Sequence, residues 1–219
     1  MIHFFILYYF SCVMCYNYKY KQNGNKMKLD SKLQKIWFTS DLHLFHKNIL
    51  KFNPSTRSGE NEFEMSSKLI HNYNSVVGEN DIVFMLGDIS FGKLENTLYA
   101  TSLLNGKKHL VLGNHDNIIL NNKDKFSGIF ETIQQYRHIY VNDQKIVLMH
   151  YPIESWDGQH YGSFHLHGHC HGSIKQAKNL RRLDVGVDNR TDNLMIPFSF
   201  EYIFEMLSAK SFKHQEEKQ

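Results

Sequence analysis

The sequence has few cysteines, few prolines and no apolar run long enough to cross a membrane. Three cysteines in 219 residues cannot form the disulfide scaffold of a chain this size, and three prolines leave regular helices and strands largely uninterrupted. The apolar run of residues 4–10 is far below the ~20 residues that span a bilayer. A composition that is 42% hydrophobic and 21% charged also excludes disorder and collagen-like repeats. We expect one ordinary globular domain.

An excess of positive charge is also missing from most of the chain. Six of the 25 basic residues precede Ile36 and face a single acid, Asp30, so the remainder carries 19 basic and 21 acidic residues, a balance of −2. A nucleic-acid binder needs lysines and arginines to neutralise phosphates. The charge therefore argues against long DNA or RNA as a partner, whereas a short or cyclic nucleotide stays open as a substrate.

Residues 1–20 differ from the rest of the chain, since they hold eight of its 30 aromatic residues. They lack the basic region and the small-residue cleavage site of a secretory signal. Three interpretations stay open: a non-folding extension or translation that starts at Met14 or Met27, a short membrane-associating segment, and a packed part of the domain. We expect the first, with a cytoplasmic location, and a chain beginning at Met27 should fold and function as well as the full chain. The expected parts are an extension of residues 1–30, a domain of residues 31–210 and a polar tail of residues 211–219.

Hydrophobic periodicity along the rest of the chain is typical of an α/β protein. Short apolar, β-branched runs predict buried strands, and apolar residues at helical spacing predict helices. The turn residues Asn142-Asp143 predict a hairpin, and Ser199 can cap the last helix. The expected strands are residues 35–40, 81–86, 108–112, 136–141, 145–149, 163–167 and 183–187. The expected helices are residues 62–77, 94–104, 118–126 and the segment from Ser199 through Leu207. This order predicts two packed β-sheets with helices outside, in one domain.

Polar side chains gather directly after the predicted strands. Asp41 and His43 follow the first strand, Gly87-Asp88 the second, Gly113-Asn114-His115-Asp116 the third, His150 the fifth and Gly168-His169-Cys170-His171 the sixth. Proteins of the α/β class place active sites on such loops. Each motif alone is a weak signal, but five in sequence are a specific one. The chain also holds 14 histidines, and histidine is the commonest metal ligand and proton shuttle.

In this order the motifs resemble the calcineurin-like metallophosphoesterase superfamily, whose pattern is DxH, GD, GNH followed by an acid, an isolated His and GHxH. The resemblance covers about residues 35–207. The segments HLFHKNIL, NGKKHLVLGNHD and HLHGHCHG are most similar to small bacterial and phage phosphoesterases within it. The superfamily implies a four-layer α/β/β/α sandwich, a binuclear metal centre and hydrolysis of phosphate esters.

The resemblance assigns roles to seven candidate metal ligands. Asp88 bridges two ions, Asp41, His43 and His171 complete one site, and Asn114, His150 and His169 complete the other. Two divalent ions roughly 3.5–4 Å apart can ionise a bridging water and hold the attacked phosphate. Oxygen and imidazole ligands suit manganese, iron, nickel or zinc and do not choose among them. Manganese is favoured, and it should support activity better than magnesium because imidazole ligands hold magnesium poorly.

His115 and Asp116 are the expected catalytic pair. By the resemblance, His115 lies beside the metals without binding them, where it can stabilise the transition state or protonate the leaving oxygen. Asp116 matches the carboxylate that orients that imidazole. A second role for Asp116, as the cap of the following helix, stays open and is compatible with the first.

Several other side chains near the motifs have two open roles. His46 and Asn48 could contact the phosphate or a ligand carboxylate, or they could stabilise their loop. His165 and His167 share one face of a strand, where one could support a metal ligand, although a satisfied core histidine is the commoner case. Arg57 is a candidate phosphate clamp, and a solvated loop arginine is the favoured alternative.

Short intervals between the motifs leave no room for a cap domain, so we expect an open cleft that accepts a diester as well as a monoester. Trp156 and Tyr161 could stack on a nucleobase there, with packing of their loop favoured. The sequence thus predicts a metal-dependent phosphoesterase for a small substrate. The alternative is a catalytically silent scaffold of the same fold that binds a protein partner. Such scaffolds typically lack the histidine of GNH or several ligands, whereas His115 and all seven ligand positions are present here.

Overall fold

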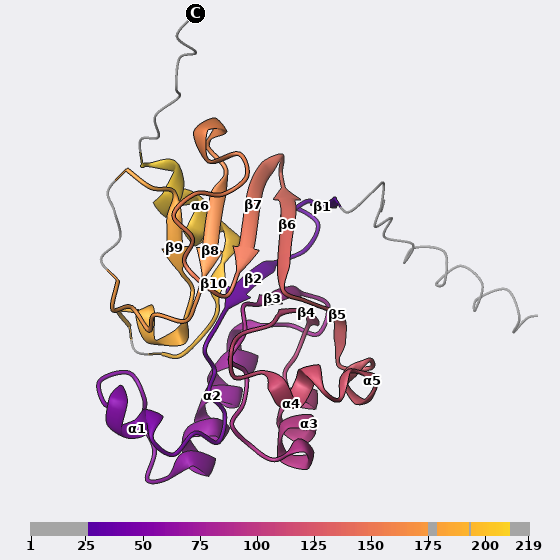
Figure 1. Cartoon of the computed structure of the whole chain (residues 1–219), viewed down its shortest axis with the longest axis vertical. Coiled ribbons are helices and arrows are strands. Elements are labelled where there is room, and N and C mark those ends of the chain that lie inside the picture. The colour runs from indigo at the N-terminus through magenta and orange to yellow at the C-terminus, as the bar shows by residue number, and fades with distance from the viewer. Residues whose placement is uncertain (1–25, 175–178, 193, 211–219) are drawn as a thin grey trace, which may run out of the picture.

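Two mixed β-sheets of five strands each form the centre of the computed structural model, which describes residues 26–174, 179–192 and 194–210 (Figure 1). The first sheet has the order β1 (Met27–Leu29), β6 (Tyr136–Val141), β7 (Gln144–Met149), β8 (Phe164–His167) and β9 (Arg182–Asp184). The second sheet has the order β10 (Phe198–Ser199), β2 (Ile36–Thr39), β3 (Ile82–Met85), β4 (Lys107–Val111) and β5 (Phe130–Gln134). The predicted pair of packed sheets is confirmed.

Helices flank the sheets, and two begin at side-chain caps. They are α1 (Ile49–Phe52), α2 (Glu62–Val76), α3 (Leu94–Ser102), α4 (Asn117–Leu120), α5 (Lys123–Phe126) and α6 (Phe200–Ser208), with 3-10 turns η1 (Gln159–Tyr161) and η2 (Val187–Asn189). The Asn61 side chain accepts hydrogen bonds from the backbone of Phe63 and Glu64 at the start of α2. The Ser199 hydroxyl accepts one from the Tyr202 amide, which confirms the predicted cap of α6.

Two apolar cores hold the layers together. The first lies between the sheets, where Phe38 and Phe84 stack at 5.4 Å against the inner faces of β6, β7 and β8. The second lies between the other face of the second sheet and the helices α2 and α3, around Tyr73, which is fully buried. Strands β2 to β4 carry buried residues on both faces, as parallel strands covered on both sides do. This packing fixes the carboxyl ends of the parallel strands relative to one another.

Several elements differ from the sequence prediction, and three of the differences have a clear structural description. The single helix expected at residues 118–126 is two short helices, α4 and α5, because Asn122 leaves the helical conformation and its side chain donates to the Ile118 carbonyl at 2.8 Å. Strand β5 was not predicted, although it pairs in parallel with β4. Strand β9 ends at Asp184 rather than at residue 187, since the chain turns into η2.

The amino-terminal boundary also needs correction. Strand β1 runs parallel to β6, and its residues Met27 and Leu29 are only 6% and 9% exposed in the core between the sheets. The prediction that residues 1–30 lie outside the fold is therefore wrong for residues 27–29. A three-residue strand is too short to show a sequence period. The interpretations of residues 1–20 concern a segment outside the described residues.

Strand β1 leads to a prediction about truncation. A chain that begins at Met27 keeps β1 and should melt within a degree or two of the full chain. A chain that begins at Ser31 loses Met27 and Leu29 from the core and should melt at least several degrees lower, since full burial of each such side chain contributes ~1.5–3 kcal/mol. Thermal melts of the three chains measure this. Equal melting temperatures for the two truncated chains would show that β1 adds no stability.

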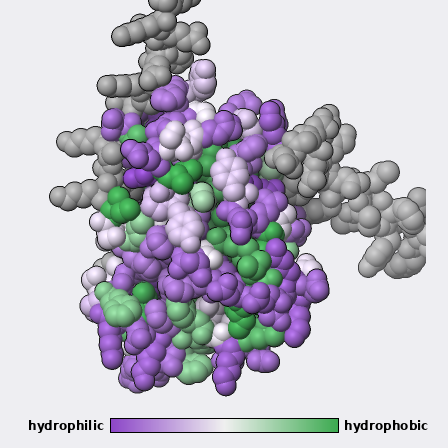
Figure 2. Space-filling model, viewed as in Figure 1, coloured by the Kyte–Doolittle hydropathy of each residue, from purple (hydrophilic) through white to green (hydrophobic). Residues whose placement is uncertain are grey.

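The described helices are all short. The longest, α2, has 15 residues, and none of those in the described ranges has the length and apolar character needed to cross a membrane. Figure 2 shows a mostly hydrophilic face on which apolar patches are separated by polar side chains. Most of the buried apolar side chains of the described residues belong to the two cores.

Candidate metal centre

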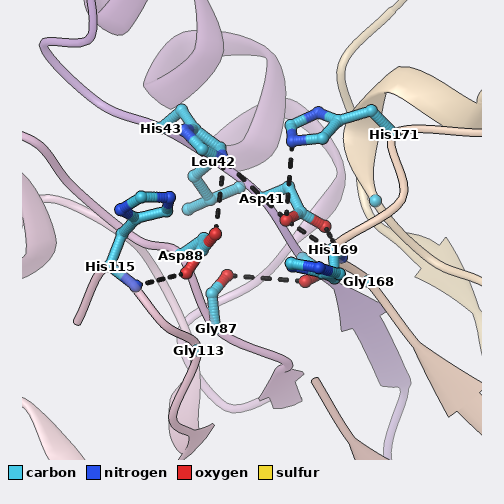
Figure 3. Close-up of polar contacts among 12 residues, drawn as sticks. Asp41, Leu42, His43, Gly87, Asp88, Gly113, His115, Gly168, His169 and His171 are labelled. Atoms are coloured by element: carbon cyan, nitrogen blue, oxygen red, sulfur yellow. Dashed lines mark hydrogen bonds and ion pairs between the residues drawn. The ribbon is translucent and has the colours of Figure 1, made fainter. Parts of the chain in front are cut away.

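The predicted ligands meet where parallel strands of both sheets end. Figure 3 shows five of them: Asp41, His43, Asp88, His169 and His171. The loops after β2 and β3 are held together by backbone hydrogen bonds, from the Asp41 amide to the Gly87 carbonyl at 2.9 Å and from the His43 amide to the Asp88 carbonyl at 3.0 Å. The loop after β8 joins them because the His169 amide donates to the Asp41 carboxylate at 2.9 Å. Segments far apart in the sequence thus build one site.

Two groups of side chains at this edge could each hold a metal ion. Their ligand atoms lie within 4.8 Å of one another in each group, which comprise Asp41, His43 and His171 in one and Asp88, His150 and His169 in the other. Asp88 connects the groups, since its Oδ2 lies 3.6 Å from His43 Nε2 and 3.5 Å from His150 Nε2. Asn114 Oδ1 lies 3.0 Å from His150 Nε2. The structure therefore brings all seven predicted ligands together.

Glycines in the motifs permit this close approach. A Cβ atom on Gly113 would stand 2.3 Å from Asp88 Oδ1, and one on Gly168 would stand 2.3 Å from Asp41 Oδ2. No side chain fits at such distances. The glycines of the GNH and GHxH motifs are thus required so that the backbone of each loop can reach a carboxylate.

The backbone at the site is unusual as well. Five of the seven predicted ligands have a positive φ, between 47° and 70°: Asp41, His43, Asp88, His169 and His171. Residues other than glycine adopt this left-handed conformation rarely and at a cost. Such conformations persist where surrounding contacts impose them, and they concentrate at functional sites. Here the five residues come from three motifs, and their side chains all lie at the candidate metal centre.

The hydrogen bonding of His150 shows that hydrogen-bond acceptors converge in the second group. Its Nδ1 donates to the Leu86 carbonyl at 2.6 Å, so Nε2 of the neutral ring carries a lone pair. That lone pair faces the oxygens of Asn114 and Asp88. Acceptors that face one another need a proton or a metal cation between them. Burial lowers the pKa of His150, but Asp88 outweighs it and holds that pKa above its ordinary value.

In the first group, His43 has a buried ring nitrogen without a hydrogen-bond partner in the described part of the chain. Its Nε2 is buried and has no hydrogen-bond partner among the described residues, although it lies 3.8 Å from Asp41 Oδ1 and 3.6 Å from Asp88 Oδ2. Burial lowers the pKa of His43, which favours the neutral ring and its lone pair. Burial alone would raise the pKa of Asp88, but His150 and the His115 amide lower it to about 2. An ionised carboxylate beside unprotonated imidazole fits a divalent cation.

His115 and Asp116 lie together at the site but are not hydrogen-bonded to each other in the way predicted. The Asp116 carboxylate accepts from the amides of Gly113, Asp88 and Ile89 at 2.8–2.9 Å. It makes no side-chain cap to α4. Burial raises the pKa of Asp116 above its ordinary value and outweighs these amide hydrogen bonds, which lower that pKa. Its visible role is to fasten the GD and GNH loops together, while the exposed His115 ring packs 4.6 Å from Phe91.

His46 contacts the candidate ligand His43. Its Nδ1 lies 3.2 Å from His43 Nδ1, and its ring stacks on Phe91 at 3.9 Å. Burial, followed by repulsion from neighbouring cations, lowers the pKa of His46 to about 4. A neutral His46 can accept the Nδ1 proton of His43, which leaves His43 Nε2 free for a metal. Asn48, by contrast, occupies the cap position of α1 without a side-chain cap bond.

Arg57 is neither a phosphate clamp nor a solvated loop residue, which corrects both predictions. It is 3% exposed and makes two bonds to the carboxylate of Asp188, from Nε at 2.8 Å and from Nη2 at 2.7 Å. The Asp188 Oδ2 atom in turn lies 2.7 Å from His171 Nδ1. Sequence reasoning missed Asp188. Like the candidate ligands, it lies shortly after the end of a strand, in this case β9.

The remaining candidates are structural. His165 and His167 are buried, and their Nδ1 atoms bond the carbonyls of Val147 and Gly168 at 3.2 and 2.9 Å. Burial lowers the pKa of both to about 4, so they are neutral core histidines. Trp156 is buried and donates to Ser163, which confirms packing. Tyr161 is 79% exposed and does not line the cleft described next.

An open cleft of about 690 Å³ lies over the candidate metal centre. Histidines of the site form part of its lining, and apolar residues form much of the rest. The lining residues are His43, His46, Ile49, Phe52, Asn53, His115, Pro152, His169, Cys170, His171, Ser173 and Ile174. Burial raises the pKa of Cys170 to about 11, so its thiol stays protonated and belongs to neither ligand group. Among these described lining residues there is no lysine or arginine.

Comparisons with known proteins agree with this geometry. A model of the calcineurin-like phosphoesterase family matches residues 34–206. The "Uncharacterized protein MJ1445" of Methanocaldococcus jannaschii is 34% identical over 180 residues, covering 80% of this chain and 92% of its own. The "Gene 66 protein" of Mycobacterium phage L5 is 29% identical over 184 residues, covering 71% and 87%. The crystal structure of AQ665 from Aquifex aeolicus, titled a protein of unknown function, has a similar fold, with a TM-score of 0.59 at 23% identity over 79% of this chain and 99% of that one.

Proposed function

The chain belongs to the calcineurin-like phosphoesterase family, and from this premise we propose that it is a binuclear-metal phosphodiesterase for small substrates. One observation carries the proposal. Asp88 Oδ2 stands 3.6 Å from His43 Nε2 and 3.5 Å from His150 Nε2, and these two histidines belong to different ligand groups. A carboxylate in that place can be shared by two cations, and two cations are what a phosphate ester needs for attack and for charge neutralisation.

The residues would divide between two ions. Asp41, His43 and His171 would hold one, and Asn114, His150 and His169 would hold the other, with Asp88 shared. Bound divalent ions supply Lewis acidity, which lowers the pKa of water and offsets the charge on phosphate oxygens. The oxygen and imidazole donors suit manganese, iron, nickel or zinc, and manganese is our preferred ion.

His115 acts on the leaving group in this proposal. Its backbone amide donates to Asp88 Oδ1 at 2.9 Å, which fixes its position relative to the shared carboxylate. Its imidazole is exposed and lines the cleft. A ring at that place can donate its proton to the leaving oxygen as the phosphorus–oxygen bond breaks. Asp116 contributes by fastening the two loops that carry Asp88 and His115.

The cleft favours a diester over a monoester. A phosphodiester has one negative charge and an organic group on each side, whereas a monoester carries up to two charges. Apolar side chains of Ile49 and Phe52 line the cleft from one segment, and Pro152 and Ile174 line it from others. Both organic groups of a diester can therefore bury apolar surface beside the histidines. The described lining offers no lysine or arginine for a second charge.

A comparison of two aryl phosphates tests the function and the preference together. We expect the manganese-loaded protein to hydrolyse bis-p-nitrophenyl phosphate with a kcat/KM at least about tenfold above that for p-nitrophenyl phosphate, because partial burial of the second ring contributes on the order of 1.4 kcal/mol. The leaving group is the same in both, so the ratio reports the rest of the substrate. The 2′,3′-cyclic nucleotides should be assayed alongside as candidate nucleoside substrates.

The controls separate the possible failures. Protein freed of metal with a chelator should hydrolyse neither compound, and added manganese should restore activity better than magnesium. Equal rates for the two aryl phosphates would remove the diester preference but leave a phosphoesterase. Protein that binds two metals and hydrolyses none of the compounds would instead support a silent scaffold of this family.

A further inference from the structure

A buried ion pair lies behind one of the candidate ligands. The side chains of Arg57 and Asp188 are 0% and 1% exposed, and the guanidinium binds the carboxylate through two parallel hydrogen bonds of 2.8 and 2.7 Å. The Thr56 hydroxyl donates to the same carboxylate. Asp188 Oδ2 then accepts from His171 Nδ1 at 2.7 Å. The imidazole, the carboxylate and the guanidinium form one continuous chain of strong bonds.

Arg57 extends this chain to the other residues of the same ligand group. Its Nη2 donates to the Asp41 carbonyl at 2.5 Å, and its Nη1 donates to the Leu42 carbonyl at 2.8 Å. These two carbonyls belong to the loop that carries Asp41 and His43. One guanidinium therefore fixes the loop after β2, and through Asp188 it fixes the ring of His171 from the loop after β8.

We propose that Asp188 and Arg57 are positioning residues for the metal site of Asp41, His43 and His171. The inference rests on the proposed function, because it concerns how that site holds its ion. Donation from Nδ1 to Asp188 leaves the lone pair of neutral His171 on Nε2, the atom 3.9 Å from Asp41 Oδ1. Support of this kind orients a ligating imidazole and raises its basicity.

The effect should be confined to one of the two sites. In the other group, His150 is oriented by the Leu86 carbonyl, and neither Arg57 nor Asp188 has a described contact with it. A buried ion pair also contributes little net stability, because desolvation of both charges offsets their attraction. The ion pair therefore acts on geometry: it fixes the ring of His171 and the loop after β2 relative to each other.

Replacing Asp188 with Asn tests the proposal through metal binding alone. Calorimetric titration of metal-free protein with manganese should resolve two sites in the wild type. In Asp188→Asn, one site should weaken by about 10–100-fold, the usual loss on removing a ligand's supporting carboxylate, while the other keeps its affinity. Asp192→Asn is the matched control, since Asp192 also pairs with an arginine, Arg190, but outside the site; both its affinities should equal the wild type.

A second readout reports the imidazole itself. Long-range ¹H–¹⁵N spectra of metal-free protein, recorded well above the ordinary histidine pKa, should show wild-type His171 protonated on Nδ1 alone. Asp188→Asn should give a mixture of the two tautomers, because the acceptor that fixes the proton has lost its charge. A merely structural carboxylate would leave the tautomer unchanged.

Arg57→Lys keeps the proposal testable if Asp188→Asn does not fold. Lysine retains the positive charge but loses the two parallel bonds and the reach to both carbonyls, so the same site should weaken several-fold. Two unchanged affinities, or equal weakening of both sites, would overturn the positioning role. A wild type that binds fewer than two manganese ions would instead contradict the proposed function.

Discussion

Asp88→Asn is expected to remove at least one of two bound metal ions and to lower kcat/KM for bis-p-nitrophenyl phosphate by roughly 10²–10³-fold, the loss seen when one preorganised electrostatic group is removed. Asp88 has the lowered pKa of a carboxylate that is ionised at neutral pH, and its Oδ2 faces a nitrogen of each ligand group. Asparagine keeps the size but loses the charge and one of the two oxygens. Metal analysis of protein saturated with manganese should find close to two ions per chain in the wild type.

The control for this experiment is Asp143→Asn. Asp143 lies in the turn between β6 and β7, where asparagine tolerates the positive φ of 67°, so its metal content and activity should match the wild type. Retention of both ions and of full activity in Asp88→Asn would contradict the shared carboxylate. A single tightly bound zinc, present equally in both proteins, would do the same.

His115→Ala should leave both metals bound and yet lower the turnover number by about 10²–10⁴, the usual share of general acid–base catalysis. His115 belongs to neither ligand group, and the contact that it makes with Asp88 uses its backbone amide, which alanine retains. The loss should be smaller for esters of p-nitrophenol than for alkyl esters, since a good leaving group needs little protonation. Turnover measured over a series of leaving groups tests this dependence.

His160→Ala is the matched histidine control, because His160 is exposed in η1 and does not line the cleft. Its activity should be that of the wild type for every ester. An equal loss across good and poor leaving groups in His115→Ala would argue against proton donation and for stabilisation of the phosphate charge. Loss of a metal ion in His115→Ala would place this histidine among the ligands instead.

Local sequence patterns were enough to predict most of the strands and the polar residues that follow them. Runs such as Ile36–Thr39 and Ile82–Met85 are apolar because both of their faces are covered, and that burial leaves a local signal of composition. The turn at Asn142-Asp143 was predictable for a similar reason, since both residues adopt a positive φ. With the strand ends located, the resemblance carried by the ordered motifs predicted seven candidate ligands, which the structure brings to one place.

The contacts that support those candidate ligands could not be predicted from local sequence patterns. Arg57 and Asp188 are 131 positions apart, and no periodicity connects residues at that separation. Asp116 was predicted to orient a neighbouring imidazole, yet the structure places its carboxylate on three backbone amides. Strand β1 was not predicted because three residues are too few to show an alternating hydrophobic pattern. Its pairing with β6 nevertheless buries Met27 and Leu29. Local patterns record whether a residue is buried, whereas the partner it meets depends on how distant segments pack, and that is fixed only when the whole chain folds.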